Sequence, residues 1–89
     1  MPLRRARGLA VAQSDAIYFP MEDVATEARV ICKVAYPYLH REIGLIGGGP
    51  TGAPMLSHFN KLRDGIEAIA SRQYDAGEGA PFVTIDDLV

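Results

Sequence analysis

The stretch PMLSHFNKLRDGIEAIASRQYDAG (residues 54–77) is the longest regular pattern in this chain of 89 residues. Its large apolar residues recur at spacings of four, three, four and three: Met55, Phe59, Leu62, Ile66 and Ile69. This spacing places them on one face of an amphipathic helix. Pro54 suits the start of that helix, and Gly77 suits the position after its end. We therefore expect a long helix over 54–77 that buries one face.

Two segments nearer the N-terminus predict the sheet on which this helix packs. The alternation in ARVICKV (28–34) is typical of a half-buried strand, whose apolar face carries Ala28, Val30, Cys32 and Val34. AIYFP (16–20) is aromatic and β-branched, so we expect a strand that ends at Pro20. A hairpin loop within 21–27 then joins the two strands.

Two shorter patterns complete the predicted elements. YPYLHREIG (36–44) indicates a two-turn helix that ends at Gly44. FVTID (82–86) indicates a last strand, and its inward-facing residues are Val83 and Ile85. Helices and strands in this order need one common core, because each element has a single apolar face.

We therefore predict a two-layer α+β fold. It has a small antiparallel sheet of three to four strands, with one short and one long helix packed on one face. Residues 15–89 form this single domain, and residues 1–14 are a flexible or partly ordered basic N-terminus. A chain of this length supports one hydrophobic core.

The charge of the chain is unevenly distributed. Arg4, Arg5 and Arg7 place three positive charges in the first seven residues, whereas the remainder has six basic and 11 acidic residues. Contacts to phosphates need clustered lysines and arginines, so nucleic acid is an unlikely partner for the acidic body. The basic start leaves weak nucleic-acid binding open as an alternative.

The sequence predicts a cytoplasmic protein with no membrane contact. The apolar run after the first arginines covers only residues 9–12, which is shorter than the core of an export signal. No run approaches the roughly 20 apolar residues that span a bilayer. The single cysteine, Cys32, cannot form an internal disulfide framework, and its strand predicts that it faces the core.

GLIGGGPTGAP (44–54) contains Gly47-x-Gly49-x-x-Gly52, the glycine spacing of a dinucleotide-binding fingerprint. Such a site needs a buried strand before the glycines and a helix that begins among them. Only two apolar residues precede the first glycine of the motif, and Pro54 is tolerated only if the helix begins there. We therefore expect a flexible connection between two helices, and no cofactor.

Two blocks resemble the short bacterial proteins known as domain of unknown function 1488. They are VICKVAYPYLHREIG (30–44) and FNKLRDGIEAIASRQYDAG (59–77), where the order Phe-x-x-x-Arg-Asp-x-Ile-Glu-x-Ile-Ala carries the likeness. With AIYFP before them and IDDL at the end, the resemblance covers about residues 15–89. It implies a small α+β fold, with an antiparallel sheet covered by helices, and it implies no known activity.

The chain departs from this family pattern in two places. The N-terminus does not show the usual first strand, and the connection at 45–54 is unusually rich in glycine. The second departure falls in a loop, where variation is expected.

Four residues are candidate contacts for a ligand or partner: Arg63, Glu67, Tyr36 and Gly49. Arg63 and Glu67 are one helical turn apart and can pair on the helix surface. Arg63 borders the apolar stripe and belongs to the block that resembles the family. Two interpretations of it stay open, a salt-bridged residue on the helix flank and an anchor for an anionic ligand or partner.

The remaining reactive residues do not form a catalytic or metal-binding set. His40 and His58 lack the further ligands that a closed metal site needs. Cys32 as a nucleophile needs exposure, a lowered pKa and a nearby base, which its strand position does not offer. We therefore expect no catalytic residue, no metal site and no enzyme activity.

These observations favour a non-enzymatic interaction or regulatory module. Its partner is an unknown protein or a second copy of the chain in a homodimer. A small anionic-ligand binder that uses Arg63 and the 45–54 glycine loop is the first alternative. A weak nucleic-acid binder that uses Arg4, Arg5 and Arg7 is the second.

Overall fold

Strands β3 (Ala16–Asp23) and β4 (Arg29–Ala35) form the centre of the sheet in the computed structural model, which describes residues 2–45 and 48–88. They pair antiparallel in one unbroken register from Ala16 opposite Ala35 to Glu22 opposite Arg29. The Asp23 carboxylate closes the hairpin by accepting hydrogen bonds from the backbone N–H groups of residues 25 and 26. The predicted hairpin is therefore present, and its loop covers residues 24–28, one residue past the predicted window.

Strand β3 continues through Pro20, so our prediction that the proline ends it was wrong. Proline lacks the N–H that a central strand needs for its ladder. Here the Pro20 carbonyl accepts a hydrogen bond from the Ala6 N–H at 3.4 Å. Because N and O of one residue in a strand point the same way, the missing N–H faces the chain between β1 and β2, where the ladder is interrupted.

The N-terminal residues belong to the sheet. Strands β1 (Leu3–Arg5) and β2 (Val11–Ala12) both pair antiparallel with β3. Leu3 is 1% exposed and lies in the core. Residues 3–5 and 11–12 therefore belong to the same sheet as residues 16–35. Strands of three and two residues are too short for alternation to reveal them.

Strand β5 (Phe82–Val83) adds a parallel partner to β4. The fold class is confirmed as mixed α+β, but the sheet has five strands in the order β1-β3-β4-β5, with β2 also on β3. The helical segment between β4 and β5 returns the chain to the same edge of the sheet in the same direction, which makes this pair parallel.

Two helices and two short 3-10 turns complete the chain. They are α1 (Tyr36–Glu42), η1 (Ala53–Met55), α2 (Leu56–Asp75) and η2 (Ile85–Leu88). Both helix ends follow the prediction, because Gly44 and Gly77 have φ angles of 84° and 105° just after the last turns. Ile85 does not continue the strand that we predicted to residue 86. The chain turns into η2 there and leaves Ile85 43% exposed.

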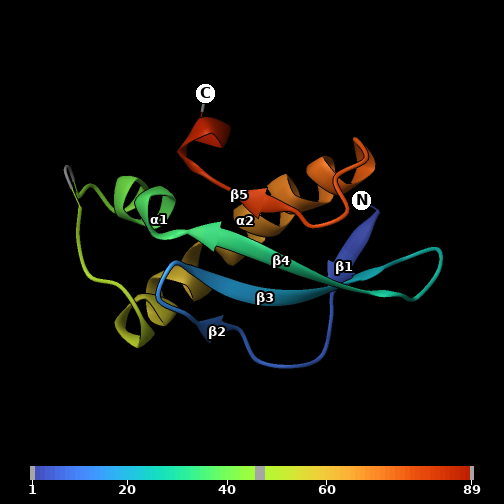
Figure 1. Cartoon of the computed structure of the whole chain (residues 1–89), viewed down its shortest axis with the longest axis horizontal. Helices are drawn as coiled ribbons and strands as arrows, with labels where there is room; N and C mark the ends of the chain where they lie inside the picture. The colour runs from blue at the N-terminus through green and yellow to red at the C-terminus, as the bar shows by residue number, and fades with distance from the viewer. Residues whose placement is uncertain (1, 46–47, 89) are drawn as a thin grey trace.

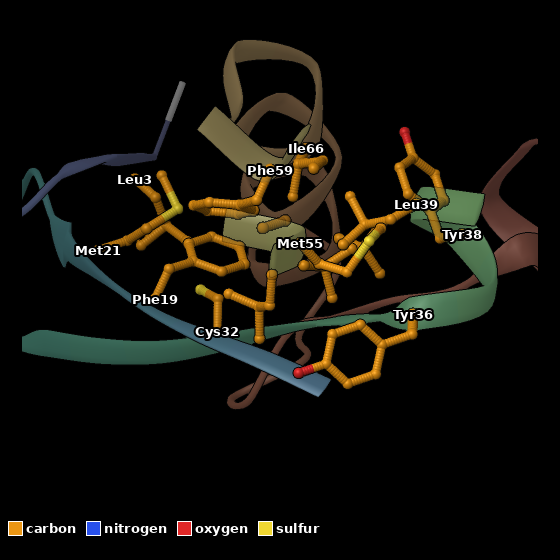
Figure 2. Close-up of a cluster of buried hydrophobic side chains, with 14 of the residues drawn as sticks. Leu3, Phe19, Met21, Cys32, Tyr36, Tyr38, Leu39, Met55, Phe59 and Ile66 are labelled. Carbon is orange, nitrogen blue, oxygen red and sulfur yellow. The ribbon is translucent and has the colours of Figure 1, made fainter. Parts of the chain in front are cut away.

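The core lies between α2 and one face of the sheet (Figure 1). Phe59 of α2 meets Phe19 of β3 with ring centroids 5.2 Å apart, and Cys32 and Met55 fill the space beside them (Figure 2). The predicted stripe is fully buried at Met55, Phe59 and Ile66, and partly buried at its other two positions.

The buried face of α2 is rotated from the predicted stripe towards Glu67, Ala70 and Ser71. The reason is β1, which packs on this flank of the helix. The Leu3 N–H donates to the Ser71 hydroxyl at 3.1 Å, in a buried hydrogen bond. A polar helix flank is thus buried because a strand that the sequence pattern did not reveal lies against it.

Replacing Phe59 by alanine should lower the free energy of unfolding by about 3–5 kcal/mol, because the ring is fully buried and its loss leaves a cavity. The matched control is Phe82→Ala, at a residue that is 39% exposed. We expect it to cost at most about half as much, since less apolar area is lost from the interior. Urea denaturation measures both, and equal losses would contradict this core.

Candidate functional site

Two predicted site residues, Arg63 and Glu67, form one ion cluster on the flank of α2. The Arg63 Nε donates to Glu67 Oε2 at 3.0 Å, so the predicted pair one turn apart is confirmed. Arg5 of β1 adds a second guanidinium, which donates to both oxygens of Glu67 at 2.9 Å. Arg5 also reaches Asp64 at 3.0 Å.

This ion cluster is buried at its centre and open at its rim. The side chains of Glu67 and Arg63 are 8% and 13% exposed, whereas those of Arg5 and Asp64 are 50% and 100% exposed. The Arg63 guanidinium lies over the Phe59 ring at 5.3 Å. Its Nη2 is buried without a hydrogen-bond partner among the side chains that the structure describes. The ion cluster therefore ties β1 to α2 rather than presenting a free cation.

The sequence analysis missed Arg5 as the partner of Glu67. Leu3 points into the core, and strand alternation then places Arg5 on the same face, towards α2. This inference can be made only once residues 3–5 are known to form a strand. Three residues do not reveal one.

The other two predicted site residues, Tyr36 and Gly49, both contact His40. The Tyr36 and His40 rings stack with centroids 6.4 Å apart. A Cβ added at Gly49 would lie 3.0 Å from His40 Cδ2 and 2.6 Å from Leu45 Cδ1, so a larger residue would require both side chains to shift. The sequence analysis gave His40 no role, yet it is 6% exposed.

His40 anchors the glycine loop to α1. Its Nε2 lies 2.6 Å from the carbonyl oxygen of Pro50. A carbonyl only accepts hydrogen bonds, so Nε2 carries the proton in this contact. Ile46 and Gly47 of the loop lie outside the described residues. The described glycines serve close packing and the turn at Gly52, where φ is 80°, and α2 begins only after them.

The glycine loop and Arg63 occupy different places. Arg63 contacts Phe59 and Glu67, and Gly49 lies against His40 and Leu45. The predicted site residues thus separate into an ion cluster on the flank of α2 and a loop anchor at α1.

A further polar contact holds the β3–β4 hairpin against the end of α2. The Tyr74 hydroxyl donates to Asp23 Oδ2 at 2.6 Å. This hydrogen bond, with those from the backbone N–H groups of Ala25 and Thr26, lowers the pKa of Asp23. The same bond raises the pKa of Tyr74, because ionised Tyr74 would lose it and face a carboxylate.

The thiol of Cys32 is fully buried, as predicted from its strand. Burial raises its pKa to about 12, so the thiol stays protonated. Within residues 2–45 and 48–88, no group of three His, Cys, Asp or Glu side chains is placed to hold a metal ion. No helix in the same part of the chain is long and apolar enough to cross a membrane.

The face of the sheet opposite α2 carries three rows of paired side chains, which we call the open face. The first row crosses four strands and contains Val11, Tyr18, Lys33 and Phe82. The second row contains Pro20 and Ile31. The third row contains Arg4, Glu22 and Arg29. These residues alternate along their strands with the core residues, so they point away from α2. Pro20 is nevertheless buried, because the connection between β1 and β2 lies against this part of the face. The Arg29 guanidinium donates to the Arg7 carbonyl of that connection at 3.1 Å.

The open face combines exposed apolar groups with a held cation. Val11, Ile31 and Phe82 are 48%, 47% and 39% exposed. The Lys33 ammonium lies 4.6 Å from the centre of the Phe82 ring and 5.7 Å from that of Tyr18. In Figure 1 the strands lie in front of α2, and the described chain places no helix over this side.

The outer edge of β5, by contrast, is already occupied. The Gln73 amide accepts from the Phe82 N–H at 2.8 Å and donates to the Phe82 carbonyl at 3.1 Å. It fills the place that a neighbouring strand would take. This leaves the open face, rather than that edge, as the surface available to a partner.

The fold is similar to that of a solved protein. The crystal structure of a protein of unknown function from the DUF1488 family of Shewanella loihica PV-4 matches with a TM-score of 0.64. The match covers 88% of this chain and 94% of that one at 16% identity, so it supports the family resemblance at the level of the fold. No protein-family model matches the sequence, and no curated protein does.

Replacing Glu67 by glutamine should lower the free energy of unfolding by about 1–3 kcal/mol, because it leaves the buried Arg63 guanidinium and the half-exposed Arg5 guanidinium without their carboxylate. Asp64→Asn is the matched control, since that side chain is fully exposed and its ion pair is screened by water. Urea denaturation of both variants at neutral pH tests the difference. A smaller loss for Glu67→Gln than for Asp64→Asn would refute the structural role of the ion cluster.

Replacing Tyr74 by phenylalanine should flatten the pH dependence of stability at both ends. The lowered pKa of Asp23 gives stability that is present above about pH 4 and lost as pH falls further. The raised pKa of Tyr74 gives stability that is present below about pH 10 and lost as pH rises further. Urea midpoints from pH 2 to 11 measure both limbs. Tyr18→Phe leaves the Asp23 contact intact and should retain the acid limb.

Proposed function

We propose that this protein is a non-enzymatic interaction module and that the open face of its sheet is the binding surface. The observation that carries this proposal is the exposure of Val11, Ile31 and Phe82 on a side that α2 does not cover. Apolar groups gathered on one face, with aromatic rings among them, are typical of surfaces that bind other proteins. Tyr18 and Lys33 add polar groups to the row that contains Val11 and Phe82.

The contacts within the ion cluster support an anionic-ligand binder less well than the open face supports an interaction module. Both oxygens of Glu67 already accept hydrogen bonds from Arg5 and Arg63. An anion at the Arg63 Nε would have to displace this carboxylate from a buried position, and the Arg63 Nη2 is itself buried. The glycine loop does not contribute to the same place, since Gly49 lies against His40.

The structure places the N-terminal arginines in a way that supports nucleic-acid binding less than their sequence clustering does. Arg4 and Arg5 point to opposite faces of the sheet, and each is paired with a carboxylate, Glu22 or Glu67. A phosphate backbone is bound by several unpaired cations on one surface. Two of the three arginines do not meet that requirement.

We also propose that the chain is a bacterial member of the DUF1488 family and acts in the cytoplasm. The fold similarity and the sequence blocks at 30–44 and 59–77 support the family. Its single, buried Cys32 suits a reducing compartment.

A photo-crosslinking amino acid at position 31 tests the proposed binding surface. In the cells that make the protein, we expect a crosslinked product from position 31, at the centre of the open face. Position 61 is the matched control, because Lys61 is exposed on the outer side of α2. No product from position 31, or equal products from both positions, would refute the open face as a binding surface.

A further inference from the structure

We propose that the partner of the open face is a second copy of this chain, packed sheet against sheet about a two-fold axis. The axis runs parallel to the strands, between β3 and β4. This inference rests on the proposed function and adds the identity of the partner. It comes from the register of the central hairpin, where complementary side chains stand opposite one another.

The β3–β4 register pairs residues of opposite chemistry on the open face. Tyr18 stands opposite Lys33, and Glu22 stands opposite Arg29. A two-fold axis between the two strands places β3 of one copy over β4 of the other. Tyr18 then faces the second copy's Lys33, and Glu22 faces the second copy's Arg29. Each contact occurs twice, as an interface between identical surfaces requires.

The same axis brings together apolar residues of the first row, whereas Arg4 in the third row has no counterpart beyond β4. In the middle row, Ile31 is 47% exposed and reaches the second copy, whereas Pro20 is buried beneath its own chain. Val11 lies on the far side of β3, and Phe82 lies on the far side of β4. The axis therefore places Val11 of each copy against Phe82 of the other. Apolar groups therefore face each other in the first row, while Lys33 faces an aromatic ring and Arg29 faces a carboxylate.

The size of the open face sets the strength of such a dimer. A strand of eight residues at about 3.4 Å each, in a sheet at most four strands wide at about 4.8 Å spacing, sets an upper limit of about 500 Å² for this face. A standard interface buries about 800 Å² on each partner. We therefore expect a dimer that dissociates on dilution, rather than an obligate one.

An acidic macromolecule is the competing occupant, because Arg4, Arg29 and Lys33 outnumber Glu22 on the open face. Two features favour the second copy. The Lys33 ammonium is already held between the Phe82 and Tyr18 rings, and Arg4 is paired with Glu22 at 2.8 Å. The face therefore presents fewer free cations than its residue count suggests.

A charge exchange between two variants tests the axis directly. Glu22→Arg places arginine against arginine in its own dimer, and Arg29→Glu places glutamate against glutamate. We expect sedimentation velocity over a concentration series to show a wild-type dimer and at least a tenfold higher Kd for each variant alone. An equimolar mixture of the two variants should dimerise again, because arginine then faces glutamate at both contacts.

Two further variants keep the test independent of folding. Ile31→Lys leaves the Arg4–Glu22 ion pair intact and should also weaken the dimer at least tenfold. Lys61→Glu changes charge on the outer side of α2 and should leave Kd unchanged. Circular dichroism and urea midpoints confirm that each variant is folded before its association is compared.

The outcomes separate this inference from the proposed function. A monomer at every concentration, or a mixture that fails to dimerise, overturns the two-fold axis. If position 31 then crosslinks to another protein, or the open face binds an acidic polymer, the interaction module stands with a different partner. If position 31 gives no product, both proposals fail.

Discussion

One helix of 20 residues has to cover a sheet of five strands, and this constraint organises the molecule. Such a helix can cover only one face, so the core forms where α2 meets Ile17, Phe19 and Met21 of β3 and their neighbours on β4. The Phe19–Phe59 contact lies within that layer. The opposite face has no second helix in the described chain. It keeps apolar groups in contact with solvent, as is typical of a surface that binds a partner.

The core is bounded by polar contacts that fix how the layers meet. The ion cluster of Arg5, Arg63 and Glu67 joins β1 to α2, and the Leu3 N–H bonds to Ser71 beside it. A buried carboxylate between two guanidiniums stabilises only one arrangement of its partners, because any shift leaves a charge unpaired. We interpret this cluster as part of the scaffold, although Arg63 and Glu67 are the residues that sequence reasoning singled out for a ligand.

The glycine-rich connection has a similar structural explanation. Gly49 packs closely against His40, and His40 bonds to the Pro50 carbonyl. The glycine spacing therefore matches a nucleotide-binding motif without the strand and helix placement that such a motif needs. Tyr36 stacks on the same histidine. Two predicted site residues thus meet at a loop anchor that neither pattern indicated by itself.

The sequence by itself determined the elements that have enough length to repeat. The long helix, the β4 alternation and the glycines that end both helices follow from local periodicity and backbone conformation, so they were predictable from residues alone. Only the tertiary structure decided the rest. Strands β1 and β2 are three and two residues long and are defined by what they pair with, and the tertiary structure ends the predicted last strand at Val83. Their pairing buries the side of α2 that carries Glu67, allows β3 to continue past Pro20 and brings the three rows of the open face together. No local pattern encodes these results, because each depends on residues far apart in the chain.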